Sequence, residues 1–147
     1  MDESACFVNK KNIYITYCSK KKVDYSIAHN KLLKPENLYI SDRVQKFVSF
    51  CKSNKYNWGI FSDYYGLVFG CEEIGWYDKH PDTVTDAEYH HLLHLTLKKI
   101  ETYDMIFFYY NHETFHLLYQ RLLQDLGKRK IVKLIDKLEG INEEQNT

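Results

Sequence analysis

The chain has 147 residues, of which 44% are hydrophobic and 27% are charged, values typical of one globular domain with a single core. Its formal net charge is zero, but residues 1–55 carry 11 basic and 5 acidic side chains, whereas residues 56–114 carry 3 and 10. No apolar run reaches the roughly 20 residues of a membrane span and the start lacks a secretory-signal pattern, so we expect a cytoplasmic protein that does not enter a membrane.

The chain begins with a strong strand candidate. Residues 12–18 (NIYITYC) are rich in β-branched and aromatic residues, which favours a buried strand of a parallel sheet. The polar stretch from Ser19 to Lys22 follows as a loop. Apolar residues show no clear periodic spacing in residues 23–36, and Pro35 is expected to break any helix there.

A helix and a second strand come next. Ser41 or Asp42 is a suitable N-cap, and apolar residues then recur at helical spacing up to a stop near Asn54. Residues 57–62 (NWGIFS) predict the second strand. A glycine-containing loop is expected from Asp63 onward.

The second half of the chain continues the alternation. Thr85-Asp86 begins a helix over about 86–103, and residues 104–111 (DMIFFYYN) predict the third strand. We expect Glu113 to open a helix that runs to Leu126 and ends at Gly127 in the C′ position. Residues 130–138 form a strand or a short helix, and their period fits a helix slightly better.

Strands that alternate with helices predict a single three-layer α/β domain with a mostly parallel, Rossmann-like sheet. The domain takes in residues 1–147, with a core over about 12–138 and a frayed tail over 141–147. Functional loops of such sheets lie at the carboxyl ends of the strands. In this chain those loops begin at Ser19, Ser62 and Asn111.

Each of these loops carries polar groups suited to a pocket. Backbone N–H groups, a hydroxyl and several ammonium groups follow the first strand, and together they suit a phosphate or a carboxylate. Tyrosines and a glycine follow the second strand, where aromatic rings suit a flat base. Asn111-His112-Glu113 follows the third strand, where catalytic groups commonly lie. The alternative for each loop is an ordinary surface turn.

Metal, cofactor and disulfide sites are not expected. His90 and His94 lie four residues apart, as do His112 and His116, but no third ligand is evident. The chain has no P-loop and no GxSxG motif, so no cofactor is expected. Its four cysteines show no CxxC spacing and fit free thiols in a reducing compartment.

The order of these motifs resembles the small uncharacterised YaaA-like domains of bacteria, archaea and phages. The matching segments are Cys18–Lys21, Leu38–Ser41, Ser62–Leu67 and Tyr77-Asp78, within a resemblance that covers about residues 12–126. The resemblance implies an α/β fold, a pocket built from these loops and a link to nucleic acids. A more distant likeness is to the small domain of archaeosine synthase, an enzyme of tRNA deazaguanine modification.

Three functional hypotheses follow. The first is an enzyme that acts on a nucleobase, nucleoside or nucleotide by glycosidic exchange or group transfer. The second is a non-catalytic nucleic-acid-binding protein with a basic N-terminal third. The third is a stress-related interaction module that contains only a packed aromatic turn. The sequence gives no oligomeric state.

The first hypothesis assigns roles to particular residues. The catalytic candidates, which would move protons, are Asp78, His112 and Glu113. The ligand-binding candidates are Cys18, Ser19, Lys20, Lys21, Tyr39, Ser41, Ser62, Tyr65, Gly66 and Tyr77. Among them, Lys20, Lys21 and Ser41 would hold an anionic group, and Tyr65 and Tyr77 would form the walls around a base.

Overall fold

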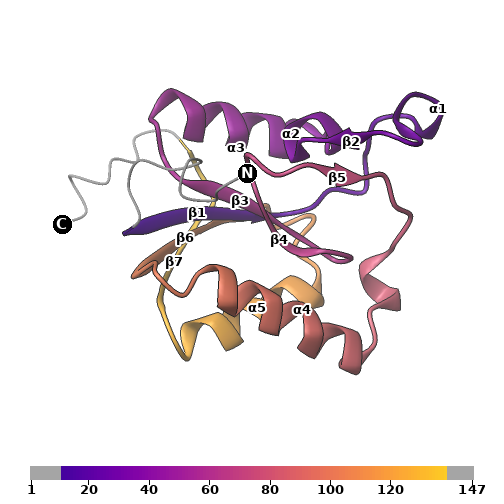
Figure 1. Ribbon diagram of the computed structural model, residues 1–147. Coiled ribbons are helices and arrows are strands. Elements are labelled where there is room, and N and C mark those ends of the chain that lie inside the picture. Colours follow the sequence, from indigo (N-terminus) through magenta and orange to yellow (C-terminus); the bar gives the residue numbers. More distant parts are fainter. Residues whose placement is uncertain (1–10, 139–147) are drawn as a thin grey trace.

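A computed structural model describes residues 11–138 of the protein as an α/β domain built on one mostly parallel sheet (Figure 1). The sheet has five strands in the order β4-β3-β1-β6-β7. Only β4 runs antiparallel to its neighbour. The strands are β1 (Asn12–Tyr17), β3 (Trp58–Ser62), β4 (Gly66–Phe69), β6 (Met105–Tyr109) and β7 (Ile131–Ile135).

The central strand β1 organises the core. It pairs with β3 on one side and β6 on the other, so that Tyr14 lies beside both Trp58 and Phe107. Its residues from Ile13 onward are buried on both faces of the sheet, which explains why the strand reads as a continuous apolar run. The Tyr14 ring stacks on Phe107 with 4.7 Å between ring centroids.

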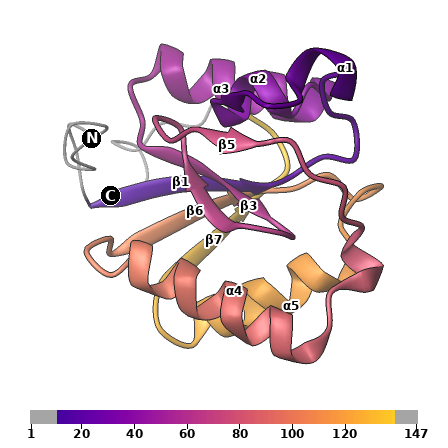
Figure 2. The same ribbon diagram turned by 45° about the vertical axis from the view of Figure 1, so that its right-hand side comes forward.

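Helices lie on both faces of this sheet, with α3 (Asp42–Ser53) on one face and α4 (Asp86–Lys99) and α5 (Leu117–Gly127) on the other (Figures 1 and 2). The expected cap of α3 is confirmed, because the Ser41 side chain accepts a hydrogen bond from the Val44 backbone N–H. The expected start of α4 is also confirmed. Thr85 and Glu88 form a capping box there.

Short elements fill the connections on the α3 side of the molecule. They are α1 (Tyr25–Ala28), β2 (Leu32–Leu33), α2 (Pro35–Leu38) and β5 (Ile74–Gly75), and β2 pairs with β5 in an antiparallel ladder. Pro35 does not simply break a helix, as we expected. It occupies the first turn of α2, where its missing N–H costs nothing.

Two other expectations about secondary structure are wrong. Part of the loop predicted after Ser62 is the strand β4, which Gly66 begins with a φ of +79°. Residues 131–135 form the edge strand β7, although the spacing fitted a helix slightly better. Pairing with β6 along the whole of β7 decides this segment, because tertiary contacts override a weak local period.

The helix α5 also differs from its prediction at both ends. It begins at Leu117 with His116 as its N-cap, and the stretch before it is a turn in place of a helix opened by Glu113. Gly127 is the last helical residue, and the C-cap is Lys128 with a φ of −73°. The helix therefore does not need a left-handed glycine at its end.

The cysteines divide into two kinds. Cys18 and Cys51 are buried and form no disulfide, as expected. Cys71 takes part in a disulfide, so the expectation of free thiols is wrong at that position. The predicted frayed tail lies outside the described residues. Within residues 11–138, every helix is too short or too polar to cross a membrane.

Candidate functional site

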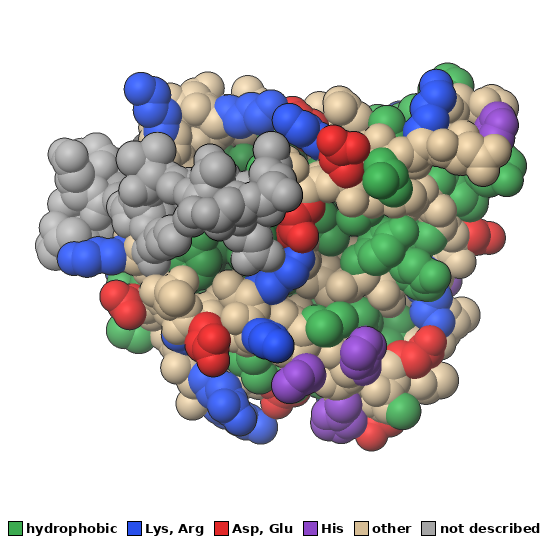
Figure 3. Space-filling view, in the orientation of Figure 1, with side chains coloured by type: hydrophobic (Ala, Val, Ile, Leu, Met, Phe, Trp, Pro, Cys, Tyr) green, Lys and Arg blue, Asp and Glu red, His purple; other side chains and the backbone are tan. Residues whose placement is uncertain are grey.

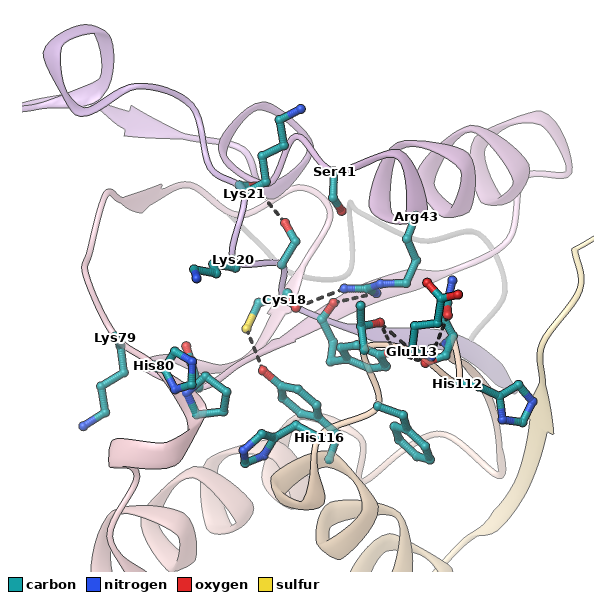
Figure 4. Close-up of a pocket in the computed structure, with 18 residues that line it drawn as sticks. Cys18, Lys20, Lys21, Ser41, Arg43, Lys79, His80, His112, Glu113 and His116 are labelled. Carbon is teal, nitrogen blue, oxygen red and sulfur yellow. Dashed lines mark hydrogen bonds between the residues drawn. The ribbon is translucent and has the colours of Figure 1, made fainter.

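A pocket of about 530 Å³ opens where β1, β3 and β6 end (Figure 4). Its walls come from the loop after β1, the first turn of α3, the residue that follows β3 and the turn between β6 and α5. The carboxyl ends of parallel strands meet at one edge of a sheet, and ligands of α/β proteins commonly bind there. The pocket therefore lies at the carboxyl ends of the strands, the location that the sequence predicted.

The loop after β1 forms one rim of the pocket. Ser19 Oγ donates to the Lys21 carbonyl at 2.8 Å and so holds the loop in a tight bend. Among residues 11–138, the backbone N–H groups of Ser19, Lys20 and Lys21 have no backbone acceptor. Lys20 and Lys21 are exposed and leave the loop in different directions (Figure 4). The rim thus offers N–H and ammonium donors to an anion.

Arg43, in the first turn of α3, provides a fixed cation on the pocket wall. Its Nη1 donates to Thr16 Oγ1 at 2.8 Å and to the Tyr17 carbonyl at 2.9 Å, and its Nη2 donates to the Cys18 carbonyl at 3.1 Å. The guanidinium also lies 3.9 Å from the centroid of the Tyr17 ring. These contacts hold the charge at one position beside the end of β1.

No carboxylate of the described chain pairs with the Arg43 guanidinium. Its hydrogen-bond acceptors are two carbonyls and a hydroxyl, which are neutral. Burial lowers the pKa of Arg43, because it disfavours the charged form. A partly desolvated guanidinium without an anion is an incomplete arrangement that an anionic ligand would complete.

Cys18 and Tyr119 form the floor beside Arg43. Cys18 Sγ lies 3.4 Å from Tyr119 Oη, and burial raises the pKa of the Cys18 thiol to about 11. Burial also raises the pKa of Tyr119 well above its ordinary value. Both groups are therefore neutral at physiological pH, so Cys18 is poorly suited to act as a nucleophile.

Asp63 follows β3 directly and lines the same pocket. Its side chain is buried, with only 4% of the residue exposed, and burial raises its pKa while the Lys22 ammonium opposes that rise. Its Oδ1 has no hydrogen-bond partner among the described residues. Hydrogen bonds from Cys18 and Tyr77 also oppose the rise in the pKa of Asp63, so the carboxyl lies in the pocket wall with its unpartnered oxygen buried.

The turn between β6 and α5 closes the pocket on the side of β6. The Tyr17 hydroxyl accepts a hydrogen bond from the Asn111 backbone N–H at 3.0 Å and lies 2.8 Å from Thr114 Oγ1. These bonds hold the turn against the end of β1. They also explain why α5 starts later than predicted. Asn111 and Thr114 are both held by the Tyr17 hydroxyl, and this arrangement is a turn and not a helix.

His116 links this turn to the segment at Pro81–Thr83, a single 3-10 turn. Its Nδ1 accepts from the Leu118 N–H at 2.9 Å and so caps α5. Its Nε2 therefore carries the proton and donates to Asp82 Oδ1. This hydrogen bond lowers the pKa of Asp82. The contact joins two segments that both contribute to the pocket wall.

Among the predicted ligand-binding residues, five line the pocket, and they are Cys18, Ser19, Lys20, Lys21 and Ser41. Of the three catalytic candidates, His112 and Glu113 also line it, whereas Asp78 is exposed and is not part of the wall. His112 points away from the pocket centre, and its Nε2 lies 3.6 Å from Asp136 Oδ2 (Figure 4). The wall thus contains only part of the predicted set.

Ser62, Tyr77 and Tyr39 lie behind the wall instead, in one buried hydrogen-bond chain. Ser62 Oγ accepts from the backbone N–H groups of Tyr64 and Tyr65 and donates to Tyr77 Oη at 3.0 Å. Tyr77 Oη in turn lies 2.7 Å from Tyr39 Oη. This chain braces the end of β3 and does not contact the pocket space.

Tyr65 and Gly66 also have structural roles. Tyr65 Oη donates to the Gly75 carbonyl at 3.0 Å, so the ring does not form a wall for a base. A Cβ at Gly66 would lie 3.3 Å from the Leu92 carbonyl of α4, and the positive φ already favours glycine there. Both residues shape the β3–β4 hairpin.

Sequence reasoning missed the two charged groups that distinguish the pocket, Arg43 and Asp63. A signal was present for each. Asp63 follows β3 directly, and Arg43 lies in the first turn of α3, the helix that connects back to β3. Helix starts and strand ends meet at the carboxyl edge of the sheet in an α/β domain.

The metal hypothesis finds no support in the described part of the chain, which contains no group of three or more potential metal ligands. His90 and His94 lie on α4, where histidines gather on the surface (Figure 3). His112 lies in the turn before α5, so His112 and His116 do not share a helical face. Comparison with protein families, curated proteins and solved structures finds no match to this chain.

Proposed function

We propose that the pocket binds a nucleotide or a related nucleobase derivative, with its anionic group at Arg43. The observation that carries this proposal is the half-buried guanidinium, which three hydrogen bonds hold in place and which no carboxylate of residues 11–138 pairs with. The N–H groups from Ser19 to Lys21, which have no backbone acceptor within residues 11–138, and the N-terminus of α3 favour the same anion.

A nucleotide suits the pocket better than a simple anion for two reasons. The volume of about 530 Å³ is in the range of small-molecule sites and far exceeds that of a phosphate ion. Phe115 and His116 also offer ring surface on the pocket wall, and such surface suits a planar base. They take the place of Tyr65 and Tyr77, which the sequence suggested for this role.

The proposal includes the family and the architecture. We propose that the chain is a YaaA-like protein with a three-layer, Rossmann-like arrangement. In support, the segments that carry the resemblance gather around one place. Cys18–Lys21 and Ser41 line the pocket, and Ser62 and Tyr77 brace it from behind. We extend the proposal to an enzyme of nucleoside or nucleic-acid modification, because Asp63 and Glu113 place carboxyl groups suited to proton transfer in the wall.

Isothermal titration of the protein with nucleoside monophosphates, nucleosides and inorganic phosphate tests the binding. We expect the nucleotides to bind more tightly than the other two ligands. Arg43→Lys keeps the charge but loses the forked geometry, and it should weaken nucleotide binding about 10-fold or more. Arg129→Lys is the matched control, because Arg129 is exposed next to the start of β7 at the opposite edge of the sheet.

Equal nucleotide affinity in the Arg43 variant would contradict the proposal, as would the absence of nucleotide binding to the original chain. Incubation with nucleosides and nucleic acids, followed by chromatography of the products, tests the enzymatic extension. Glu113→Gln should abolish any turnover and leave most of the affinity.

A second candidate function, nucleic-acid binding without catalysis, is favoured by Lys20 and Lys21. Both are exposed at the rim, and neither has a carboxylate partner among the described residues. Against it, Lys and Arg side chains are interspersed with acidic and apolar ones over the face seen in Figure 3. Binding to single-stranded or duplex DNA and RNA that weakens steeply with salt, and that Arg43→Lys leaves unchanged, would favour this second candidate.

A further inference from the structure

Arg43 has hydrogen-bond donors that the protein itself does not use. A guanidinium carries five N–H donors. Nη1 donates to Thr16 Oγ1 and to the Tyr17 carbonyl, and Nη2 donates once, to the Cys18 carbonyl, so the Nε–H and the second Nη2–H have no acceptor within residues 11–138. Nε is also accessible, because it is not among the fully buried side-chain atoms that lack a partner there. Arg43 thus offers a ligand two more donors on neighbouring nitrogens.

Two of the other charged groups in the pocket wall are balanced by partners. Lys79 Nζ lies 3.2 Å from Glu88 Oε2, so a carboxylate already compensates this cation. Asp63 has the Lys22 ammonium close enough to oppose the rise that burial causes in the pKa of its carboxyl group. Neither Lys79 nor Asp63 therefore adds an uncompensated charge to the wall.

Three cations of the wall have no such partner. Lys20, Lys21 and Arg43 pair with no carboxylate of the described chain. The remaining carboxyl group that lines the pocket within residues 11–138 is that of Glu113. Three cations against one carboxylate leave an excess of two positive charges, which a doubly charged anion compensates and a singly charged anion compensates only by half.

The free donors of Arg43 lie next to those of the loop after β1 (Figure 4). Arg43 Nη2 donates to the Cys18 carbonyl at 3.1 Å, and the N–H groups of the following residues, Ser19 to Lys21, have no backbone acceptor within the described chain. One anion can therefore accept from the guanidinium with two oxygens and from the loop with a third.

We propose that the anionic group of the ligand is a terminal phosphate, so that the pocket takes a phosphate monoester and not a nucleotide inside a polynucleotide chain. This inference rests on the proposed nucleotide-binding function and defines its anion. A phosphate monoester has three terminal oxygens and a charge of about −1.5 to −2 at pH 7. A phosphodiester has only two such oxygens and a single charge, so it leaves one donor group and one positive charge of the site without a partner.

A pair of ligands that differ by one methyl group tests this idea without any change in the protein. Each of the four ribonucleoside 5′-monophosphates is compared by isothermal titration with its own phosphate methyl ester, which is a diester with the same base and sugar. At pH 7.5 the monophosphate that binds most tightly should bind about 10-fold or more tightly than its methyl ester, the usual effect of one hydrogen bond to a charged group. Equal affinities would overturn the inference.

The pH dependence of this preference gives a second readout. The second pKa of a phosphate monoester is about 6, so at pH 5 the monophosphate carries mostly one charge, as the methyl ester does at both pH values. The preference should therefore fall by about 3-fold or more between pH 7.5 and pH 5. Changes in the protein's own side chains affect both ligands and largely cancel in the ratio. A preference that is the same at both pH values would contradict the charge balance and overturn the inference.

The Arg43→Lys variant tests the pair of donors. An ammonium group keeps the charge but does not present two N–H donors on neighbouring nitrogens, so the variant should weaken the monophosphate more than the methyl ester. Arg129→Lys, at the exposed position next to β7, is the matched control and should keep the full preference. An Arg43→Lys variant that also keeps the full preference would count against the inference.

The same titrations separate this inference from the proposed function. If the methyl esters and the dinucleotide ApA bind as tightly as adenosine monophosphate, and Arg43→Lys weakens all of them, the terminal phosphate is wrong and the nucleotide pocket stands. If neither monophosphates nor methyl esters bind, the proposed function itself is wrong.

Discussion

Replacing Asp63 by Asn should make the protein more stable at neutral pH, even though the residue lines the pocket. Burial raises the pKa of Asp63 above the value of 3.8 that holds in an unfolded chain. At pH values between the pKa of Asp63 in the unfolded chain and its higher pKa in the folded chain, the folded chain binds more protons. The contribution of Asp63 to stability therefore falls as pH rises through this range. Asp63→Asn removes this loss.

The size of the effect follows from the contacts of the carboxyl group. Burial takes the charged carboxylate out of water, a cost that the neutral Asn side chain does not carry, and for a partly buried charge this cost is about 1–3 kcal/mol. The attraction of the Lys22 ammonium offsets part of that cost. We therefore expect Asp63→Asn to raise the free energy of unfolding by about 1–2 kcal/mol at pH 7.5, which for a chain of this size corresponds to about 2–8 °C in melting temperature.

Urea denaturation followed by tryptophan fluorescence, at several pH values from 3.5 to 8, measures the difference between the two proteins. Other carboxyl groups, such as Asp82 and Asp125, have lowered pKa values and make both proteins less stable in acid, but their effect cancels in the difference. The difference should vanish near pH 3.5 and grow toward neutral pH. A difference that is constant with pH, or a variant that is less stable at pH 7.5, would refute this reasoning, and Asp104→Asn should show no such trend.

Three further outcomes are expected. The Cys18 thiol, with its pKa raised to about 11, should react with iodoacetamide at pH 8 only when the chain is unfolded, as mass spectrometry of the alkylated peptide can show. Gly66→Ala should destabilise the chain by about 1–2 kcal/mol, whereas Gly127→Ala, at a helical position with open space, should stabilise it by about 0.5–1 kcal/mol in urea titrations. Thr85→Ala should cost about 1 kcal/mol through loss of the capping box with Glu88, and an unchanged midpoint would contradict that role.

The parts of the fold that the sequence predicts well are those in which local pattern and burial agree. The strands β1, β3 and β6 are mostly apolar and almost wholly buried because helices cover both faces of the sheet. β7 is an edge strand, in which Ile131 and Leu134 are exposed and Lys133 interrupts the apolar run, so its pattern does not distinguish strand from helix. β4 is short and follows a tight turn, and only its pairing with β3 identifies it.

The candidate site also contains residues that the sequence predicts and residues that it does not. The position of Lys20 and Lys21 on the rim follows from the strand that precedes them, and it was predictable. The importance of Arg43 and Asp63 depends on what lies opposite them in space, namely the end of β1 and the absence of a partner for Oδ1 among the described residues. Periodicity and spacing carry no information about such contacts, which join segments more than 20 residues apart.

The Ser62 hydroxyl also limits how the protein can be engineered. Its hydrogen bonds to the backbone of Tyr64 and Tyr65 and to the Tyr77 hydroxyl fasten the β3–β4 reversal to the rear of the binding cavity. Insertions or grafted peptides in the turn of this hairpin would therefore shift the residues that brace the pocket. Within residues 11–138, no hydrogen bond links the turn around Lys55, at the other end of β3, to the pocket, so this turn is the safer place for a tag or a fluorophore.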